Sequence, residues 1–137
     1  FYIMFMTELG EFYDGTRLSF RTEPTWNLSK HFELGGIYSF DHVNVAARDV
    51  SMTNHIVGVK TLYMLDTRFS VNAYIQYNTA LDGIITNLRF RYNPKEGNDL
   101  YLVFNEDRNT DLNRELPYLP VYNSRAVMVK YTYTFNL

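Results

Sequence analysis

The segment VMVKYTYTFNL, residues 127–137, alternates between two kinds of side chain. Every second residue from Val127 is apolar or aromatic, and the residues between them are mostly polar, with Lys130 among them. Because successive side chains of a β-strand point to opposite faces of the sheet, this period of two predicts a strand with one apolar and one polar face. The fold class therefore depends on how often this pattern recurs along the chain.

The composition fits a single domain over residues 1–137, with a nearly balanced formal charge of −2. A nucleic-acid-binding protein usually carries a strongly basic surface, so nucleic acid is not an expected partner. The sequence has no cysteine, which excludes disulfides, thiolate metal sites and cysteine nucleophiles. Aromatic residues make up 17% of the chain, a content that favours strands, interfaces or membrane boundaries. The chain begins at "FYIMFM", which resembles the middle of a strand, so we expect it to be a piece of a longer protein.

Period-two alternation recurs along most of the sequence and predicts about eight strands. Most of the connections are short, as in hairpins, and Asp14-Gly15 is a strong turn signal. Two longer polar links are expected, at residues 41–53 and 106–124. The fold class predicted is all-β, an antiparallel up-and-down arrangement. The expected strands cover residues 1–13, 17–27, 32–40, 55–65, 69–78, 84–92, 99–105 and 127–137.

Alternation alone leaves two architectures open. In a soluble lipocalin-like barrel the apolar face fills the interior, whereas in an outer-membrane barrel it faces lipid and the lumen is polar. A tilted membrane strand needs about 9–11 residues, and many of the expected strands are close to that length. If the chain end is periplasmic, both long links fall on the extracellular side, where such barrels carry their longer loops. We therefore predict an antiparallel up-and-down transmembrane β-barrel.

Two sets of residues follow from this prediction. The first set is polar, lies on one face of the expected strands, and would point into the lumen: Arg17, Arg21, Glu23, Glu33, Lys60, Gln76, Arg89, Arg91 and Lys130. The second set is aromatic, lies near strand ends, and would form girdles at the level of the lipid headgroups: Trp26, Tyr77, Tyr92, Tyr131, Tyr133 and Phe135.

The cations of the lumen set outnumber Glu23 and Glu33, and this has two interpretations. The lumen could attract anions or contact a plug, or its charges could pair with one another and stabilise the wall. No catalytic, cofactor-binding or metal-binding residue is predicted. The three histidines, His31, His42 and His55, match no compact zinc motif. Asp41 and His42 are adjacent and would point to opposite faces of a strand, which does not suit a catalytic pair.

Several segments resemble a known family. They are "PTWNLS", "IQYN", "NLRFRYNP…GNDLYLVFN" and the ending "LPVYNSR…VKYTYTF", which together span the chain from Pro24 onwards. The family comprises outer-membrane proteins of Bacteroidota whose members carry an N-terminal carbohydrate-binding-like domain, similar to family 9 modules, and a long C-terminal β-barrel region. The terminal strand is similar to the signal by which such barrels are recognised for insertion, although Asn136 and Leu137 follow its final aromatic residue.

The resemblance implies that these strands are the C-terminal part of a larger barrel. We expect that barrel to be a non-enzymatic, porin-like channel or a scaffold in the bacterial outer membrane, linked to surface glycan handling or export. Its expected partners are the lipid bilayer, other outer-membrane or surface-exposed proteins, and glycan. The alternatives are a soluble small-ligand carrier of the lipocalin kind and a barrel enzyme.

Overall fold

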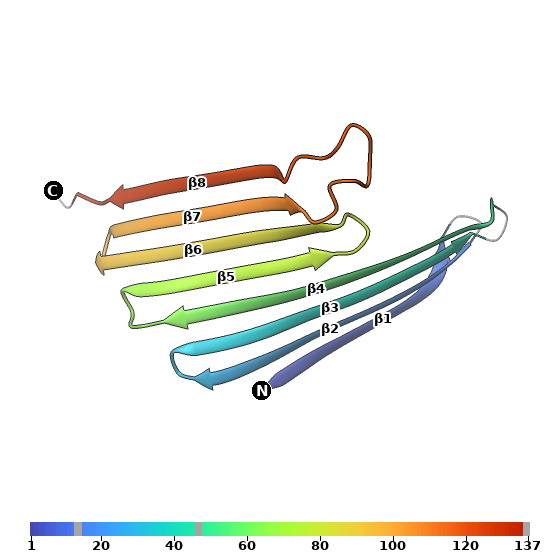
Figure 1. The fold of residues 1–137 in the computed structure, drawn as a ribbon. Helices are drawn as coiled ribbons and strands as arrows, with labels where there is room; N and C mark the ends of the chain where they lie inside the picture. Colours follow the sequence, from blue (N-terminus) through green and yellow to red (C-terminus); the bar gives the residue numbers. More distant parts are fainter. Residues whose placement is uncertain (13–14, 46–47, 136–137) are drawn as a thin grey trace.

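A computed structural model of the chain describes residues 1–12, 15–45 and 48–135. Eight strands form one sheet in sequence order, each antiparallel to the next (Figure 1). Over the described residues, no helix is long and apolar enough to cross a membrane. The strands are β1 (Tyr2–Phe12), β2 (Gly15–Ser29), β3 (Phe32–Val45), β4 (Val50–Met64), β5 (Phe69–Asn78), β6 (Gly83–Lys95), β7 (Asn98–Asn109) and β8 (Tyr122–Tyr133). The predicted all-β, up-and-down arrangement of about eight strands is confirmed.

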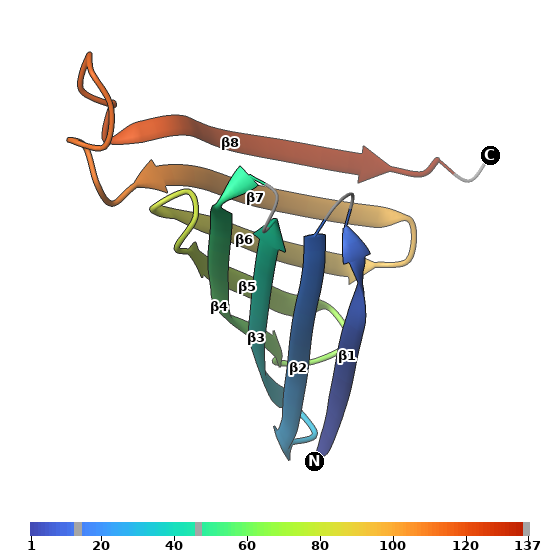
Figure 2. The same ribbon diagram turned by 90° about the vertical axis from the view of Figure 1, so that its right-hand side faces the viewer.

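The sheet is open. It twists strongly, and its two edge strands, β1 and β8, lie well apart in both views (Figures 1 and 2). Within the described residues β8 pairs only with β7, and β1 only with β2. The described strands therefore do not form a closed barrel.

The register keeps two faces in phase across all eight strands. Val59 on β4, for example, lies opposite Gly36 on β3 and Ile75 on β5, while Lys60 lies opposite Gly35 and Tyr74. We call the face that contains Val59 the apolar face and the face that contains Lys60 the polar face. The three register shifts among the described strands fall at strand ends, so they do not exchange the faces within the sheet.

In a soluble sheet the most buried side chains lie on the apolar face, whereas here they lie on the polar face. The buried side chains at the centre of the sheet are Thr25, Ile37 and Ser39, with 1%, 8% and 6% of their surface exposed, and all three belong to the polar face. On the apolar face, Val59 is 48% exposed and Val129 is 67% exposed. The side chains at the centre of the polar face therefore crowd one another, and among the described residues neither face has a second layer over it.

The expected polar link at residues 41–53 is largely strand. β3 continues to Val45 and β4 begins at Val50, with pairs such as Asp41 opposite Asn54 and Val43 opposite Met52. Polar residues in this segment suggested a loop, but cross-strand partners satisfy both the backbone and several side chains. The other long link is confirmed, and it narrows to residues 110–121. The expected turn at Asp14-Gly15 and the placement of Asn136 depend on residues outside the described ranges.

Candidate functional site

The polar face contains all nine residues of the expected lumen set. Four of their cations are held in ion pairs on this face: Arg17 with Asp41 at 2.8 Å, Arg21 with Glu23 at 2.7 Å, Lys60 with Glu23 at 3.2 Å, and Arg91 with Asp99 at 2.8 Å. Glu23 thus accepts from two strands at once, because Arg21 lies on β2 and Lys60 on β4. The Arg17 and Arg91 pairs each link two neighbouring strands, the Arg21 pair lies within β2, and the Lys60 pair joins β4 to β2 across β3.

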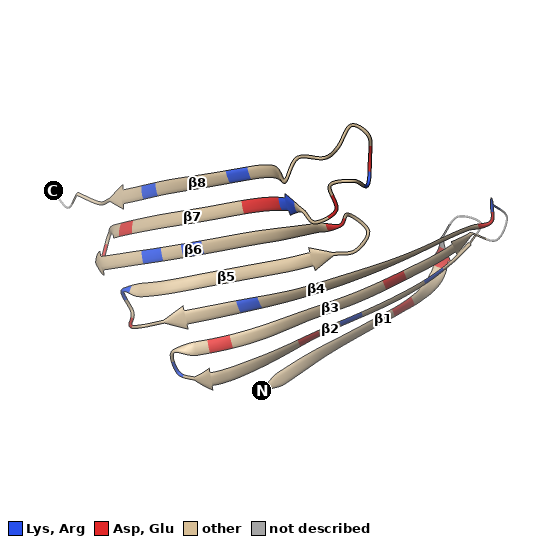
Figure 3. Cartoon of the chain, viewed as in Figure 1, with Lys and Arg blue, Asp and Glu red and all other residues tan. Residues whose placement is uncertain are grey.

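Charge on the polar face is balanced. The register adds acids to this face beyond Glu23 and Glu33, among them Asp41 and Asp107, which the sequence analysis placed in links between strands. Figure 3 shows the charged residues within strands, with none on β5. The cations Arg17, Arg21, Lys60, Arg89, Arg91 and Lys130 equal in number the acids Glu8, Glu23, Glu33, Asp41, Asp99 and Asp107. The expected excess of cations over acids is wrong at the level of the whole face, and mutual pairing accounts for most of the charges.

Three residues of the set have other surroundings. Gln76 accepts a hydrogen bond from the Tyr74 hydroxyl. Arg89 lies opposite Asn72 on β5 and Val103 on β7, and Lys130 lies opposite Tyr101. Among the described residues neither Arg89 nor Lys130 takes part in an ion pair. Positive charge that is not already neutralised is thus concentrated on β6 and β8.

Two hollows lie side by side on the polar face. The first has a volume of about 240 Å³ and is lined by side chains from β3 to β6, among them Glu33, Lys60, Leu62, Asn72, Tyr74 and Asn87. The second has a volume of about 230 Å³ and lies at the β2–β3 turn, among Asn27, Ser29, His31, Glu33 and Leu62. Glu33 and Leu62 line both hollows, so the two are neighbours, and we call them together the inner groove.

Gly35 explains the course of the Lys60 side chain beside this groove. A Cβ atom on Gly35 would lie 2.7 Å from both Cγ and Cε of Lys60, closer than real side chains approach. Only glycine at this position leaves room for the lysine to lie across β3 and reach Glu23 on β2. The ammonium is therefore directed away from the inner groove and toward its carboxylate partner.

The apolar face carries the aromatic set. Trp26, Tyr92 and Tyr133 lie near the end of the sheet that holds the β2–β3, β4–β5 and β6–β7 turns, and Tyr77 lies near the opposite end (Figure 1). Ring pairs follow the first of these ends: Phe32 with Tyr63 at 6.3 Å, Phe69 with Phe90 at 4.6 Å, and Tyr133 with Phe135 at 4.5 Å between centroids. Tyr131, Tyr133 and Phe135 are all exposed, so they do not pack into a dry core.

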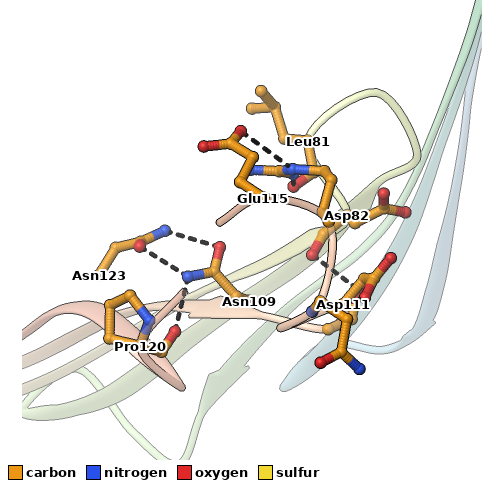
Figure 4. A network of polar contacts seen from close by, with 10 residues as sticks. Leu81, Asp82, Asn109, Asp111, Glu115, Pro120 and Asn123 are labelled. Carbon is orange, nitrogen blue, oxygen red and sulfur yellow. Dashed lines mark hydrogen bonds and ion pairs between the residues drawn. The ribbon is translucent and has the colours of Figure 1, made fainter. Parts of the chain in front are cut away.

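A polar cluster anchors the long loop at the other end of the sheet. The amides of Asn109 and Asn123 hydrogen-bond to each other at 2.7 and 3.1 Å, and Asn109 also donates to the Pro120 carbonyl at 2.7 Å (Figure 4). The Thr110 amide donates to the Asp82 carbonyl at 2.7 Å. These contacts fix the loop of residues 110–121 against the β5–β6 turn. We assign this cluster a structural role, because the buried Asn109 amide is fully engaged by its protein partners.

The histidines and nearby carboxylates do not converge. His31 contacts the Met64 carbonyl at 2.9 Å, His42 the Thr53 hydroxyl at 2.8 Å, and His55 the Tyr38 hydroxyl at 3.1 Å. Asp41 faces Arg17 on the polar face, whereas His42 lies on the apolar face, as the alternation predicted. In the part of the chain that the structure describes, no group of three His, Asp or Glu side chains could hold a metal ion.

Comparison with known proteins adds no relative. No protein-family model matches the chain, and a search of curated proteins found no significant match. The family resemblance described above remains a prediction.

Sequence reasoning identified the members of the polar face but not the inner groove. Glu33, Asn72 and Asn87 come from three different strands, and only the register brings them to one depression. The available signal was the run of uncharged polar residues at every second position of β5, from Ser70 to Asn78.

Proposed function

We propose that this chain forms part of the wall of a larger antiparallel β-barrel in a bacterial outer membrane, serving as a non-enzymatic channel or scaffold. One observation carries the proposal: the crowded face of the sheet is polar and ion-paired, whereas the uncovered face is apolar across all eight strands. Exposed apolar patches on soluble monomers rarely exceed a few hundred Å². Lipid is the surrounding that makes such a face stable.

The distribution of burial also separates this proposal from a soluble carrier. A lipocalin-like barrel would place its apolar side chains on the crowded inner face, to line the ligand cavity. Here that face holds Thr25, Ser39 and the ion pair between Lys60 and Glu23. The aromatic side chains near the strand ends of the apolar face fit the headgroup level of a bilayer.

Closure of the barrel is part of the proposal. Within hydrocarbon every backbone N–H and C=O needs a partner, so a bilayer does not tolerate the free edges that β1 and β8 present here. We infer that further strands pair with these edges in the assembled wall. The suggested link to surface glycan handling or export rests on the family resemblance.

Labelling along one strand tests which face meets lipid. Because the sequence has no cysteine, single cysteines at residues 71–76 of β5 give six clean positions for an environment-sensitive NBD fluorophore in vesicles. We expect the apolar-face positions 71, 73 and 75 to be quenched by doxyl groups on lipid chains, and positions 72, 74 and 76 to be quenched by aqueous iodide. Iodide quenching at all six positions would exclude a membrane wall, and the reverse pattern would mean that the apolar face is inside.

A planar-bilayer measurement separates the channel from the scaffold. If the polar face lines an open lumen, the reconstituted protein produces stepwise conductance. A sealed bilayer, with the labelling pattern intact, would assign the scaffold role.

A further inference from the structure

The inner groove combines hydrogen-bonding groups of both kinds that no protein partner uses. Among the described residues, Glu33 has no ion pair, and the exposed Asn72 amide has no hydrogen-bond partner. The Asn87 amide nitrogen donates to Asn105, which leaves its oxygen free to accept. The Tyr74 hydroxyl donates its hydrogen to Gln76, so the hydroxyl oxygen of Tyr74 can still accept a hydrogen bond.

Charge in and around the groove is nearly compensated. Lys60 is committed to Glu23 at 3.2 Å and lies across Gly35, so its charge does not attract a solute anion strongly. Arg89 lies opposite Asn72, on the far side of the groove from Glu33, and balances that carboxylate. The groove therefore favours neither a strongly cationic nor a strongly anionic solute.

This pattern selects a class of ligand. An ammonium group only donates hydrogen bonds and would leave the Asn72 NH₂ and Arg89 without acceptors. A carboxylate or phosphate only accepts, and would leave Glu33 and the free oxygens of Asn87 and Tyr74 without donors. A hydroxyl group does both. The two hollows, about 240 and 230 Å³, extend the contact surface over more than one sugar-sized unit.

We propose that the inner groove binds a neutral polyhydroxylated solute, a short oligosaccharide, during its passage along the polar face. The inference rests on the proposed function, because such a solute reaches the groove only if this face lines a water-filled lumen. Glu33 and the Asn72 amide would provide the principal hydrogen bonds, and Leu62 would provide the apolar floor between the two hollows.

Calorimetric titration of the full chain tests this proposal. The protein is kept in lauryldimethylamine oxide, a detergent without a sugar headgroup, and titrated with maltohexaose, xylohexaose, spermidine and citrate. We expect one or both hexasaccharides to bind more tightly than spermidine and citrate. Glu33→Gln and Asn72→Val should each weaken that binding about tenfold, since each removes a direct hydrogen bond to the solute.

The matched control is Thr132→Val, a polar-to-apolar change on the same face that lines neither hollow. It should leave binding unchanged, and the heat-dependent gel mobility of all three variants shows whether they fold. Tighter binding of spermidine, abolished by Glu33→Gln, would assign the groove to cations and overturn the proposal. Tighter binding of citrate, no hexasaccharide binding, or equal binding by all the folded variants would also overturn it.

The two proposals can fail separately. Titration in detergent does not depend on which face meets lipid, and NBD labelling of β5 does not depend on sugar binding. If labelling gives the expected pattern but no oligosaccharide binds, the proposed ligand is rejected and the proposed barrel wall is retained.

Discussion

The two faces of the sheet share one backbone and one alternation, yet they differ in what surrounds them. On the polar face, ion pairs such as Arg17–Asp41 and the amide contact of Asn87 with Asn105 connect neighbouring strands, and Ile37 is a buried side chain of the same face. On the apolar face, valine, leucine and aromatic side chains contact one another along the strands but are left uncovered.

This difference shows where the stability of the fold has to come from. In a soluble sheet, burial of the apolar face supplies the dominant favourable term. Here the protein itself buries mainly the polar face, so the apolar face must gain its stabilisation from a surrounding that the chain does not provide. The cross-strand pairs of the polar face hold the register, and the surroundings of the apolar face decide whether the sheet is stable.

The largest effect is expected from placing a charge on each face in turn. Val59→Arg puts a cation in the middle of the apolar face, and Met4→Arg puts one on the polar face opposite Glu23; the original side chains are 48% and 54% exposed. In lipid vesicles, Val59→Arg should lower the free energy of unfolding by about 2–4 kcal/mol, the cost of a cation facing the bilayer midplane. Met4→Arg should change it little.

Urea titration of both variants in vesicles provides the measurement. Equal and small losses for the two variants would show that both faces meet water, and would remove the contrast between them.

A smaller effect is expected from two adjacent glycines that point to opposite faces. Gly35→Ala places a Cβ atom 2.7 Å from the Lys60 side chain and should break its ion pair with Glu23, at a cost of about 1 kcal/mol. Gly36→Ala places its Cβ 3.2 Å from Cγ of Pro24, which needs a shift of only a few tenths of an ångström. Replacing glycine by alanine also lowers the conformational entropy of the unfolded chain, which stabilises the folded state by about 0.4–1 kcal/mol. This gain should offset the strain at Pro24.

The two alanine variants are compared by their urea midpoints under identical conditions. The contrast would be lost if Gly36→Ala proved the more damaging of the two, because crowding would then belong to the apolar face.

The smallest effect is expected from neutralising single acids. Glu23→Gln weakens contacts to both Arg21 and Lys60 on the polar face and should cost about 1 kcal/mol or less, since these pairs are partly exposed. Glu106→Gln, at the loop end of the apolar face, weakens only the 2.7 Å pair with Arg125 and should cost less. Raising the salt concentration should reduce both differences, because screening weakens exposed ion pairs.

A denaturant series at low and high salt measures this order. A larger loss for Glu106→Gln than for Glu23→Gln would mean that the shared carboxylate does not link the strands.

Local rules were sufficient for the strands and their faces. Alternation in β5 and β8 requires no long-range information, and it placed Gln76 and Lys130 on the polar face and Tyr77 and Tyr131 on the apolar one. The same reasoning failed at residues 41–45 and 50–53, where polar residues such as Asn44 and Ser51 are mixed with apolar ones. Their pairing depends on partners across the hairpin, such as Thr53 for His42, which composition does not reveal.

The arrangement across strands could not be predicted in the same way. Lys60 can reach Glu23 because the β3 residue between them, Gly35, has no side chain. The register of β3 against β4 places Gly35 there, and the sequence alone does not show this register. Asp41 and Asp107 were missed as members of the polar face because β3 and β7 continue beyond the expected strand ends at residues 40 and 105. The distance between β1 and β8 depends on the accumulated twist of the whole sheet, which no short pattern encodes.

The position of the register shifts has a consequence for how this chain can be altered. A one-residue insertion inside a strand would turn every following side chain of that strand to the other face, and the neighbouring strands could not compensate. The same insertion within residues 110–121 or 65–68 changes only a connection between strands. Epitope tags, fluorescent labels and loop grafts therefore belong in those two segments, and the lengths of the strands themselves are effectively fixed.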